Sequence, residues 1–404
     1  MKQKKTALSS RQYLVPFALI TSLFFMWGFA RAILDVLNKH FQNELNITIT
    51  QSALIQVTTY LGYFLMAIPA GLFINRLGYR RGVVMGLMLF GIGSLLFIPC
   101  AAAGTFYAFL GALFVIGCGL VFLETAANPY VTELGPKETA TSRINFSQSF
   151  NGAGCMFATL GVGAFLFRDS GDGGNVAVPY AIMGALVLLI ALVFSRVSLP
   201  EIVHDDDAAT TEGSKNLSRL WHNKWFVFGL LALLSYEVAE ISINSYFVNF
   251  VTGQGWMGDR MASMLITGAL ATFMAGRFLG SWVMRHIAAE RLMLACAAGS
   301  VVCIALVLLD LDRVSMAALL CNYLFEAIMF PTIFAMALRG LGGLTKSASS
   351  ILMMTPVGGC GFLLMGYIAD TTGNLTVPFL IPLVGFAIVL AYTVCYVRRD
   401  KNKA

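Results

Sequence analysis

The sequence predicts an all-α integral membrane protein with twelve transmembrane helices. Hydrophobic residues make up 58% of the 404 residues and charged residues only 12%, about half of the charged fraction that soluble domains carry. The mean hydropathy is +0.76. The apolar residues gather in runs of about 20, the length that crosses a bilayer. Lipid is therefore the expected solvent for most of this chain.

The apolar runs divide the chain into two sets of six. One long polar connection interrupts them, at residues 199–224, and it contains an acidic run and several small polar residues. We therefore expect an N-terminal six-helix half at 1–198, a linker at 199–224 and a pseudo-symmetric C-terminal half at 225–404. The twelve expected spans are 13–38, 51–75, 82–101, 105–132, 142–167, 176–198, 225–251, 260–284, 289–309, 314–339, 346–369 and 375–398.

Lys and Arg in the connections predict the orientation. Of the 27 basic residues, 21 fall on the side of the N-terminus and the central linker, and four fall on the other side. Arg31 and Arg277 lie within spans. Since basic residues accumulate in cytoplasmic loops, we expect a multi-pass protein of the bacterial inner (cytoplasmic) membrane with both termini cytoplasmic.

Several classes of function are disfavoured by the composition. The eight cysteines contain no C-x-x-C pair, and none of the four histidines lies in the middle of an apolar run. No nucleophile with a base, metal-ligand cluster or phosphate loop is visible. We therefore expect neither an enzyme nor a metal or organic cofactor. The basic residues lie in membrane connections, so nucleic acid is not an expected partner.

The loop between the second and third spans carries a motif. The stretch "GLFINRLGYRRG" is loosely echoed by "GRFLGSWVMRHIAAERL" at the corresponding place in the second half. Related halves with a site between them are typical of alternating-access transporters. The first stretch resembles the G-x-x-x-[DN]-R-x-G-x-[RK]-[RK] loop of the major facilitator superfamily, which implies that superfamily's fold and a gating loop. The matching residues are Gly71, Asn75, Arg76, Gly78, Arg80 and Arg81.

Charged residues inside the first span need compensation, because an ionisable side chain at the bilayer centre costs about 2.5–3.5 kcal/mol even on the lenient insertion scale. Arg31 and Asp35 are four residues apart and share a helix face. We expect an ion pair between them. It is either a structural pair or part of a transport cavity in which Asp35 takes up a proton.

Polar stripes in other spans predict a cavity. Residues of each stripe lie three or four apart and so share a face. Each amide on its own is equally consistent with packing between helices, but several stripes favour a shared aqueous chamber. The stripe residues are Gln56, Tyr60, Glu124, Asn128, Gln148 and Asn151 in the first half and Glu240, Asn244 and Glu326 in the second.

Three of these stretches resemble a particular transporter group. "SLFFMWGFARAILDVLNKHFQ", "LETAANPYVTELGP" and "NFSQSFNGAG" are similar to the first, fourth and fifth helices of bacterial L-fucose–proton symporters, whose group includes glucose/galactose transporters. The resemblance implies that Asp35 and Glu124 carry proton coupling and sugar binding. It also implies that Gln148 and Asn151 contact sugar and that Trp27 lies near the site.

The chain departs from that pattern. Arg31 stands where the fucose symporters have Asn, and Phe330 stands where they have Tyr. The stretch "YEVAEISINSYFVNF" is more similar to glucose/galactose members: Glu240 and Asn249 match, while Asn244 replaces a glycine. The sugar is therefore left open.

Together these observations predict a monomeric, proton-coupled symporter that imports a neutral monosaccharide such as L-fucose or a related hexose. We expect Asp35 and Glu124 to line one chamber; which of them carries the proton stays open. Sodium coupling is a second reading, since carboxylates and amides also bind that ion. A drug or organic-cation antiporter of the same superfamily is a third, although Arg31 would repel cations. A non-transporting sugar sensor is the fourth.

Overall fold

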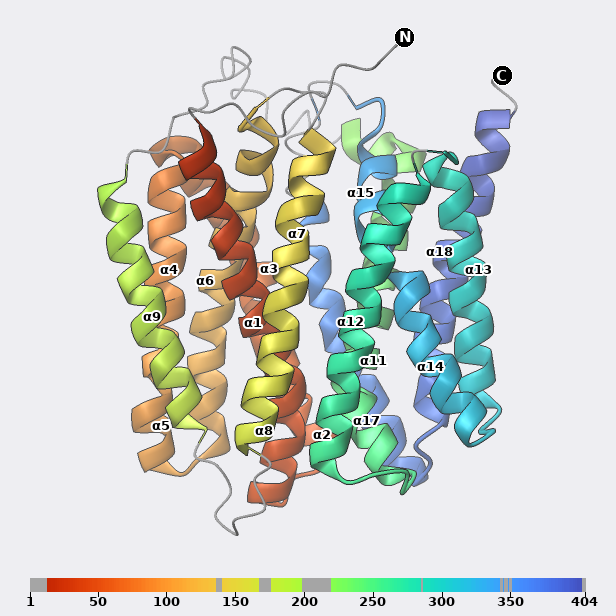
Figure 1. The fold of residues 1–404 in the computed structure, drawn as a ribbon, viewed down its shortest axis with the longest axis horizontal. Helices are drawn as coiled ribbons and strands as arrows, with labels where there is room; N and C mark the ends of the chain where they lie inside the picture. The colour runs from red at the N-terminus through yellow and green to blue at the C-terminus, as the bar shows by residue number, and fades with distance from the viewer. Residues whose placement is uncertain are drawn as a thin grey trace.

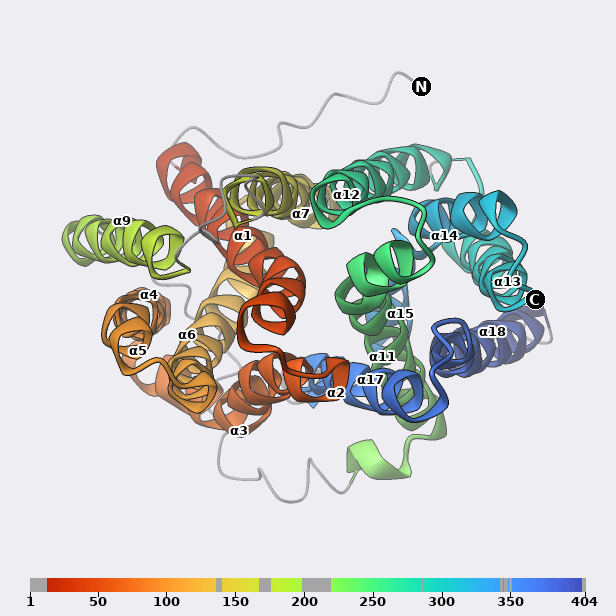
Figure 2. The same cartoon turned by 90° about the horizontal axis from the view of Figure 1, so that it is seen from below.

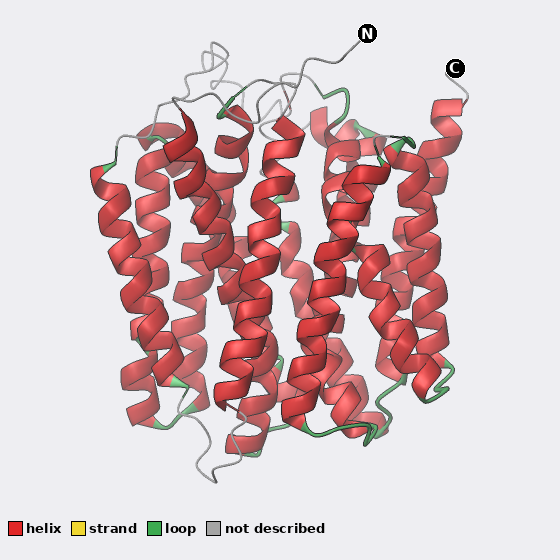
Figure 3. Cartoon of the chain, viewed as in Figure 1, coloured by secondary structure: helices red, strands yellow, loops and turns green. Residues whose placement is uncertain are grey.

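The computed structural model is helical throughout the part of the chain it describes, and no strand occurs there (Figure 3). The helices form one bundle, and α1 begins at the end of the bundle where α18 finishes (Figure 1). We call this end the termini face and the other end the opposite face. The described residues are 13–135, 140–166, 176–197, 219–284, 286–341, 344, 348 and 351–401.

The first group of helices packs around a core that is built almost entirely from its own apolar side chains. Figure 2 shows this group on one side of the bundle, with α7 beside α12 and α2 beside α17 of the second group. Its elements are α1 (Leu14–Leu45), α2 (Ile49–Ser52), α3 (Leu54–Leu77), α4 (Tyr79–Leu95), α5 (Phe97–Ala103), α6 (Phe106–Glu133), α7 (Ala140–Phe157), the π-helical turn η3 (Ala158–Val162), α8 (Gly163–Leu166) and α9 (Ala177–Arg196).

The second group has a separate apolar core. Its elements are α11 (Lys224–Gly253), α12 (Asp259–Val283), α13 (Ala289–Leu308), α14 (Arg313–Glu326), α15 (Met329–Leu338), the 3-10 turn η6 (Thr355–Cys360), α17 (Gly361–Thr372), the 3-10 turn η7 (Val377–Phe379) and α18 (Leu380–Lys401). The linker predicted at 199–224 falls mostly outside the described residues, so the exact division of the chain stays a prediction.

Eleven of the twelve expected spans correspond to helical segments that are long and apolar enough to cross a bilayer. The exception within the described ranges is 346–369, where η6 leads into α17, a helix of only 12 residues. The residues at this junction include Pro356, Gly358, Gly359 and Gly361. Glycine and proline disfavour a continuous α-helix, which explains the tighter turn.

Helix α1 packs against α7 at very short range. A Cβ on Gly28 would lie 2.1 Å from the backbone oxygen of Asn151, and a Cβ on Gly154 would lie 2.1 Å from that of Phe25. Small residues permit such backbone approach between membrane helices. The approach places the polar faces of α1 and α7 side by side.

The two groups also meet at the opposite face. Asn43 Nδ2 donates to Asp259 Oδ2 at 2.7 Å, and the backbone N–H of Thr50 donates to Asp370 Oδ2 at 2.8 Å. A Cβ on Gly366 would lie 2.9 Å from the backbone nitrogen of Thr50. These contacts join α1 and α2 to α12 and α17, so the opposite face is closed in this arrangement.

The α1–α7 contact gives the first prediction. Gly154→Ala should lower the thermal unfolding temperature of the purified protein in detergent, because overpacking of this kind costs about 1–3 kcal/mol. Gly111→Ala is the matched control, since a Cβ on Gly111 of α6 meets nothing within 4 Å. The control should unfold at or slightly above the wild-type temperature. Equal unfolding temperatures for both variants would contradict the close approach.

Candidate functional site

A small polar cavity lies between the two groups of helices. Helices α1, α6 and α7 form one wall, and α11, α12 and α15 form the other. Its volume is about 30 Å³, which is room for a few water molecules and far too little for a monosaccharide. The residues that line it are Trp27, Arg31, Glu124, Gln148, Asn151, Tyr236, Glu237, Glu240, Arg277 and Phe330.

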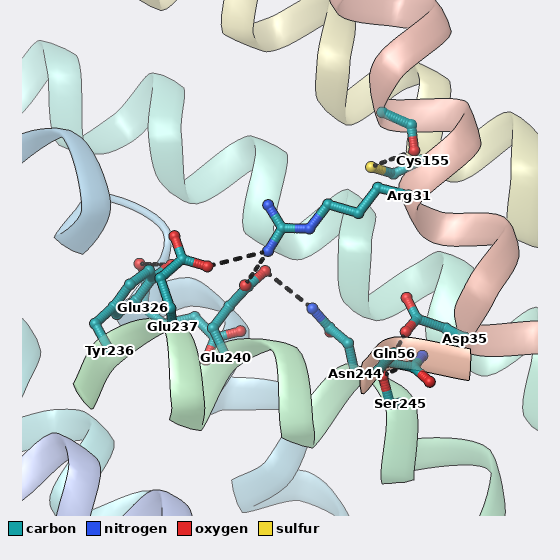
Figure 4. A network of polar contacts seen from close by, with 11 residues as sticks. Arg31, Asp35, Gln56, Cys155, Tyr236, Glu237, Glu240, Asn244, Ser245 and Glu326 are labelled. Atoms are coloured by element: carbon teal, nitrogen blue, oxygen red, sulfur yellow. Dashed lines mark hydrogen bonds and ion pairs between the residues drawn. The ribbon is translucent and has the colours of Figure 1, made fainter. Parts of the chain in front are cut away.

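Arg31 reaches across this cavity. Its Nη2 donates to Glu240 Oε2 at 2.8 Å and to Glu237 Oε2 at 3.3 Å, both on α11 (Figure 4). The expected pairing with Asp35 is therefore wrong. The long Arg31 side chain extends away from its own helix because two carboxylates converge on the far wall, and the one cation contacts both.

Asp35 points elsewhere and does not line the cavity in this arrangement. It is buried, and its Oδ1 accepts a hydrogen bond from Ser245 Oγ of α11 at 2.9 Å. Gln56 Nε2 donates to the same Ser245 oxygen at 2.9 Å. The expectation that Asp35 and Glu124 line one chamber is therefore wrong in this arrangement: Glu124 lines the cavity and Asp35 does not.

Arg277 is a cavity residue that was not among the expected site residues. Its Nε donates to the backbone oxygen of Ala327 at 3.2 Å, and its Nη1 donates to Gln148 Oε1 at 3.2 Å. Ala327 lies at the break between α14 and α15, where its oxygen is free to accept. The guanidinium also lies 4.6 Å from the centre of the Phe273 ring. The position of Arg277 within an apolar span could have identified it from the sequence as a site residue.

Two cavity groups are available to a ligand. Glu124 has neither a hydrogen bond nor an ion pair with any residue in the described ranges. The indole Nε1 of Trp27 is buried and has no hydrogen-bond partner there either. An unpaired buried donor or acceptor is unfavourable, so each of these groups would gain from a polar partner. In the same described part, no three His, Cys, Asp or Glu side chains are placed to hold a metal.

The remaining expected site residues lie around the cavity rather than in its lining. Asn244 Nδ2 donates to Glu240 Oε1 at 2.9 Å and so supports a lining residue. Glu326 is fully buried and accepts from Asn322 Nδ2 at 2.7 Å. Asn128 Nδ2 lies 3.9 Å from the sulfur of Met353. Tyr60 is buried against the ring of Tyr63, with 5.7 Å between ring centres.

The loop motif lies at the termini face, between α3 and α4. Gly78 joins the two helices with a φ of 86°, a left-handed value that favours glycine. Arg80 Nη2 donates to the backbone oxygen of Ser195 at the end of α9. Gly71 and Arg76 lie in α3 and Arg81 in α4; the side chain of Asn75 lies outside the described set.

Residues 20–359 match the model of the Major Facilitator Superfamily. The chain belongs to this superfamily. Within it, the chain is 33% identical over 420 residues to the L-fucose-proton symporter of Escherichia coli (strain K12), with 96% of this chain and 94% of that protein covered. It is 34% identical over 394 residues to the glucose/galactose transporter of Brucella abortus biovar 1 (strain 9-941), covering 95% and 94%. This superfamily member therefore falls in the group of those two transporters.

Solved structures support the same assignment for this superfamily member. The crystal structure of FucP in the outward conformation matches with a TM-score of 0.75 and 33% identity, covering 95% of this chain and 99% of that one. The partially occluded inward open xylose transporter XylE from E. coli matches with a TM-score of 0.74 at 13% identity, covering 94% and 98%. The second likeness shows the fold alone.

The Arg31 ion pairs give the second prediction. Arg31→Ala should destabilise the protein by about 3–5 kcal/mol, because it leaves two buried carboxylates without a cation. Adding Glu240→Gln to Arg31→Ala should recover part of that loss, and Glu240→Gln alone should cost less than Arg31→Ala. Thermal unfolding of the three variants in detergent measures the coupling. Strictly additive effects would argue against the pairing.

Proposed function

We propose that this protein imports a neutral monosaccharide together with protons by alternating access. It would act as a monomer in the inner membrane of a bacterium, with the termini face toward the cytoplasm. The observation that carries the proposal is the cavity between the two groups of helices, with Glu124 and the Trp27 indole N–H free to receive a ligand. The printed functions of the two relatives, fucose and glucose/galactose transport, favour a sugar.

The cavity chemistry suits hydroxyl groups. Carboxylate and amide side chains accept and donate hydrogen bonds, and Glu124, Gln148 and Asn151 provide both kinds from one wall. The flat rings of Trp27 and Phe330 provide apolar surface for the carbon face of a sugar ring. The charge of Arg31 is already compensated by carboxylates of α11, so a neutral substrate leaves the local charge balance intact.

Binding a sugar requires the two groups of helices to separate, because the cavity is much smaller than a monosaccharide. The contacts of Asp259 and Asp370 at the opposite face would break when the site opens to the outside. At the termini face, the loop of Gly71, Asn75, Arg76, Gly78, Arg80 and Arg81 would act as the corresponding gate.

Proton coupling is assigned to Asp35 and Glu124. Each is buried and makes no ion pair in the part of the chain that the structure describes. An ionised carboxylate away from water is costly without a cation, and a proton removes that cost. Sodium could neutralise the same groups, so the experiment must vary both ions.

The third prediction concerns the substrate. Proteoliposomes that contain the purified protein should accumulate at least one of L-fucose, D-glucose and D-galactose when the outside is acidic. A protonophore should abolish the accumulation, and a sodium gradient at equal pH should not replace the proton gradient. Accumulation driven by sodium alone would refute proton coupling, and no uptake of any of the three sugars would refute this substrate class.

The fourth prediction concerns the carboxylates. Asp35→Asn and Glu124→Gln remove a titratable group with little change in size, so at least one should lower proton-driven accumulation about tenfold or more. Exchange of labelled for unlabelled sugar at equal pH separates the roles: a proton carrier keeps exchange, whereas a sugar ligand loses it. If both variants still accumulate sugar against its gradient, the assignment is wrong.

An organic-cation antiporter is a second candidate, favoured by one observation. Three carboxylates line the cavity, from Glu124, Glu237 and Glu240, against the two guanidinium groups of Arg31 and Arg277. Competition distinguishes the two functions. Free hexoses should inhibit uptake of the labelled substrate of a sugar importer, whereas tetraphenylphosphonium should inhibit that of a cation antiporter.

A further inference from the structure

Asp35 lies on the seam between the two groups of helices. It comes from α1 and Gln56 from α3, whereas Ser245, which contacts both, comes from α11. Figure 4 shows these three side chains together, apart from the Arg31 ion pairs. We call Gln56, Ser245 and Asp35 the seam relay. It joins the two groups through side chains that are all at most 8% exposed.

The direction of the hydrogen bonds in the seam relay is fixed by chemistry. Gln56 Nε2 can only donate, so Ser245 Oγ accepts from it at 2.9 Å. The single hydroxyl proton of Ser245 is then directed to Asp35 Oδ1, also at 2.9 Å. A donor stabilises an ionised carboxylate more strongly than a neutral carboxylic acid. The Ser245 hydroxyl therefore stabilises the ionised form of Asp35 and opposes the effect of burial, which favours the neutral acid.

No cation is paired with Asp35 in the described ranges, because Arg31 is held by Glu237 and Glu240. The relay hydroxyl is therefore the main compensation for a negative charge at this place. Other charged or titratable groups face Asp35 from several elements at longer range. They are Arg31 on its own helix, Tyr60 of α3, Cys155 of α7, Glu240 of α11 and Tyr323 of α14.

The relay depends on closure of the opposite face. Further along α1 in that direction, Asn43 donates to Asp259 at 2.7 Å and Lys39 Nζ lies 4.0 Å from the same carboxylate. Separation of the two groups at this face would carry Ser245 away from Asp35 and expose the carboxylate to water. Opening of the opposite face would therefore break the relay.

We propose that the seam relay allows Asp35 to release its proton while the opposite face is closed, with Ser245 and Gln56 as positioning residues. The Asp35 O–H bond breaks, its electron pair stays on the carboxylate, and the proton passes to water that enters as the two groups separate at the termini face. The Ser245 hydroxyl stabilises the carboxylate that remains. This inference rests on the proposed function, since it assigns a step within proton-coupled sugar import.

Ser245→Ala tests the proposal in right-side-out membrane vesicles that contain the full-length protein. Proton-driven sugar accumulation should fall about tenfold, because the ionised carboxylate loses its donor. Sugar exchange at equal pH, which needs no proton release, should stay within about twofold of wild type. Raising the pH inside the vesicles should partly restore accumulation by favouring release. Gln56→Leu, which removes the amide donor, should lower accumulation by a smaller factor and should also leave exchange nearly unchanged.

Two variants serve as controls. Ser245→Thr keeps the hydroxyl and should retain accumulation. Ser242→Ala removes a hydroxyl from the same helix, one turn earlier, which is equally buried and has no hydrogen-bond partner in the described structure. This control should behave as wild type. Loss of accumulation in Ser242→Ala to the same extent as in Ser245→Ala would overturn the proposal.

The remaining outcomes are also decisive. If exchange and accumulation fall together in Ser245→Ala while Ser245→Thr is normal, the serine is structural and the proposal fails. If Ser245→Ala accumulates sugar as wild type does, the relay has no role, and the proposed function stands. If wild-type vesicles accumulate no sugar in a proton gradient, proton-coupled sugar import fails, and with it the role given to the relay.

Discussion

The interaction on which the centre of this protein depends is the contact of Arg31 with Glu237 and Glu240. Charges in a bilayer interior are stable only when they compensate each other or reach water. Here the cation comes from α1 and the carboxylates come from α11, so charge compensation is also a connection between the two groups of helices. Any movement that opens the cavity must stretch or replace this connection.

The same constraint separates two environments along α1. Arg31 faces a polar cavity with groups of both charges, whereas Asp35, one turn away, is buried in the seam with a hydroxyl as its donor. Two neighbouring positions of one helix thus lie in different surroundings. Close packing of α1 on α7 through Gly28 and Gly154 fixes the helix that carries both.

The fold was largely predictable from the sequence, because long apolar runs leave few alternatives to membrane helices. Composition and segment length therefore gave eleven spans that match helices. The junction at Pro356 was harder to predict, because a run of apolar residues and glycines has the composition of one continuous transmembrane helix. The family resemblance supplied the most specific site residues.

The pairing of the site residues was not predictable to the same extent. Spacing on one helix shows which residues share a face, and this predicted Arg31 with Asp35. It cannot show that Glu237 and Glu240 of a distant segment converge on Arg31. Arg277 was missed for a similar reason, because its partners are a helix break at Ala327 and Gln148 of the other group.

The backbone approach of Gly366 to Thr50 has a practical consequence. A hydrogen atom is the only substituent that fits between α17 and the start of α2 at this point. A bulky side chain introduced there would keep α17 and α2 apart and hold the transporter open at the opposite face. One substitution far from the cavity would then provide a conformationally trapped sample for imaging, with every ligand-binding group left as it is in nature.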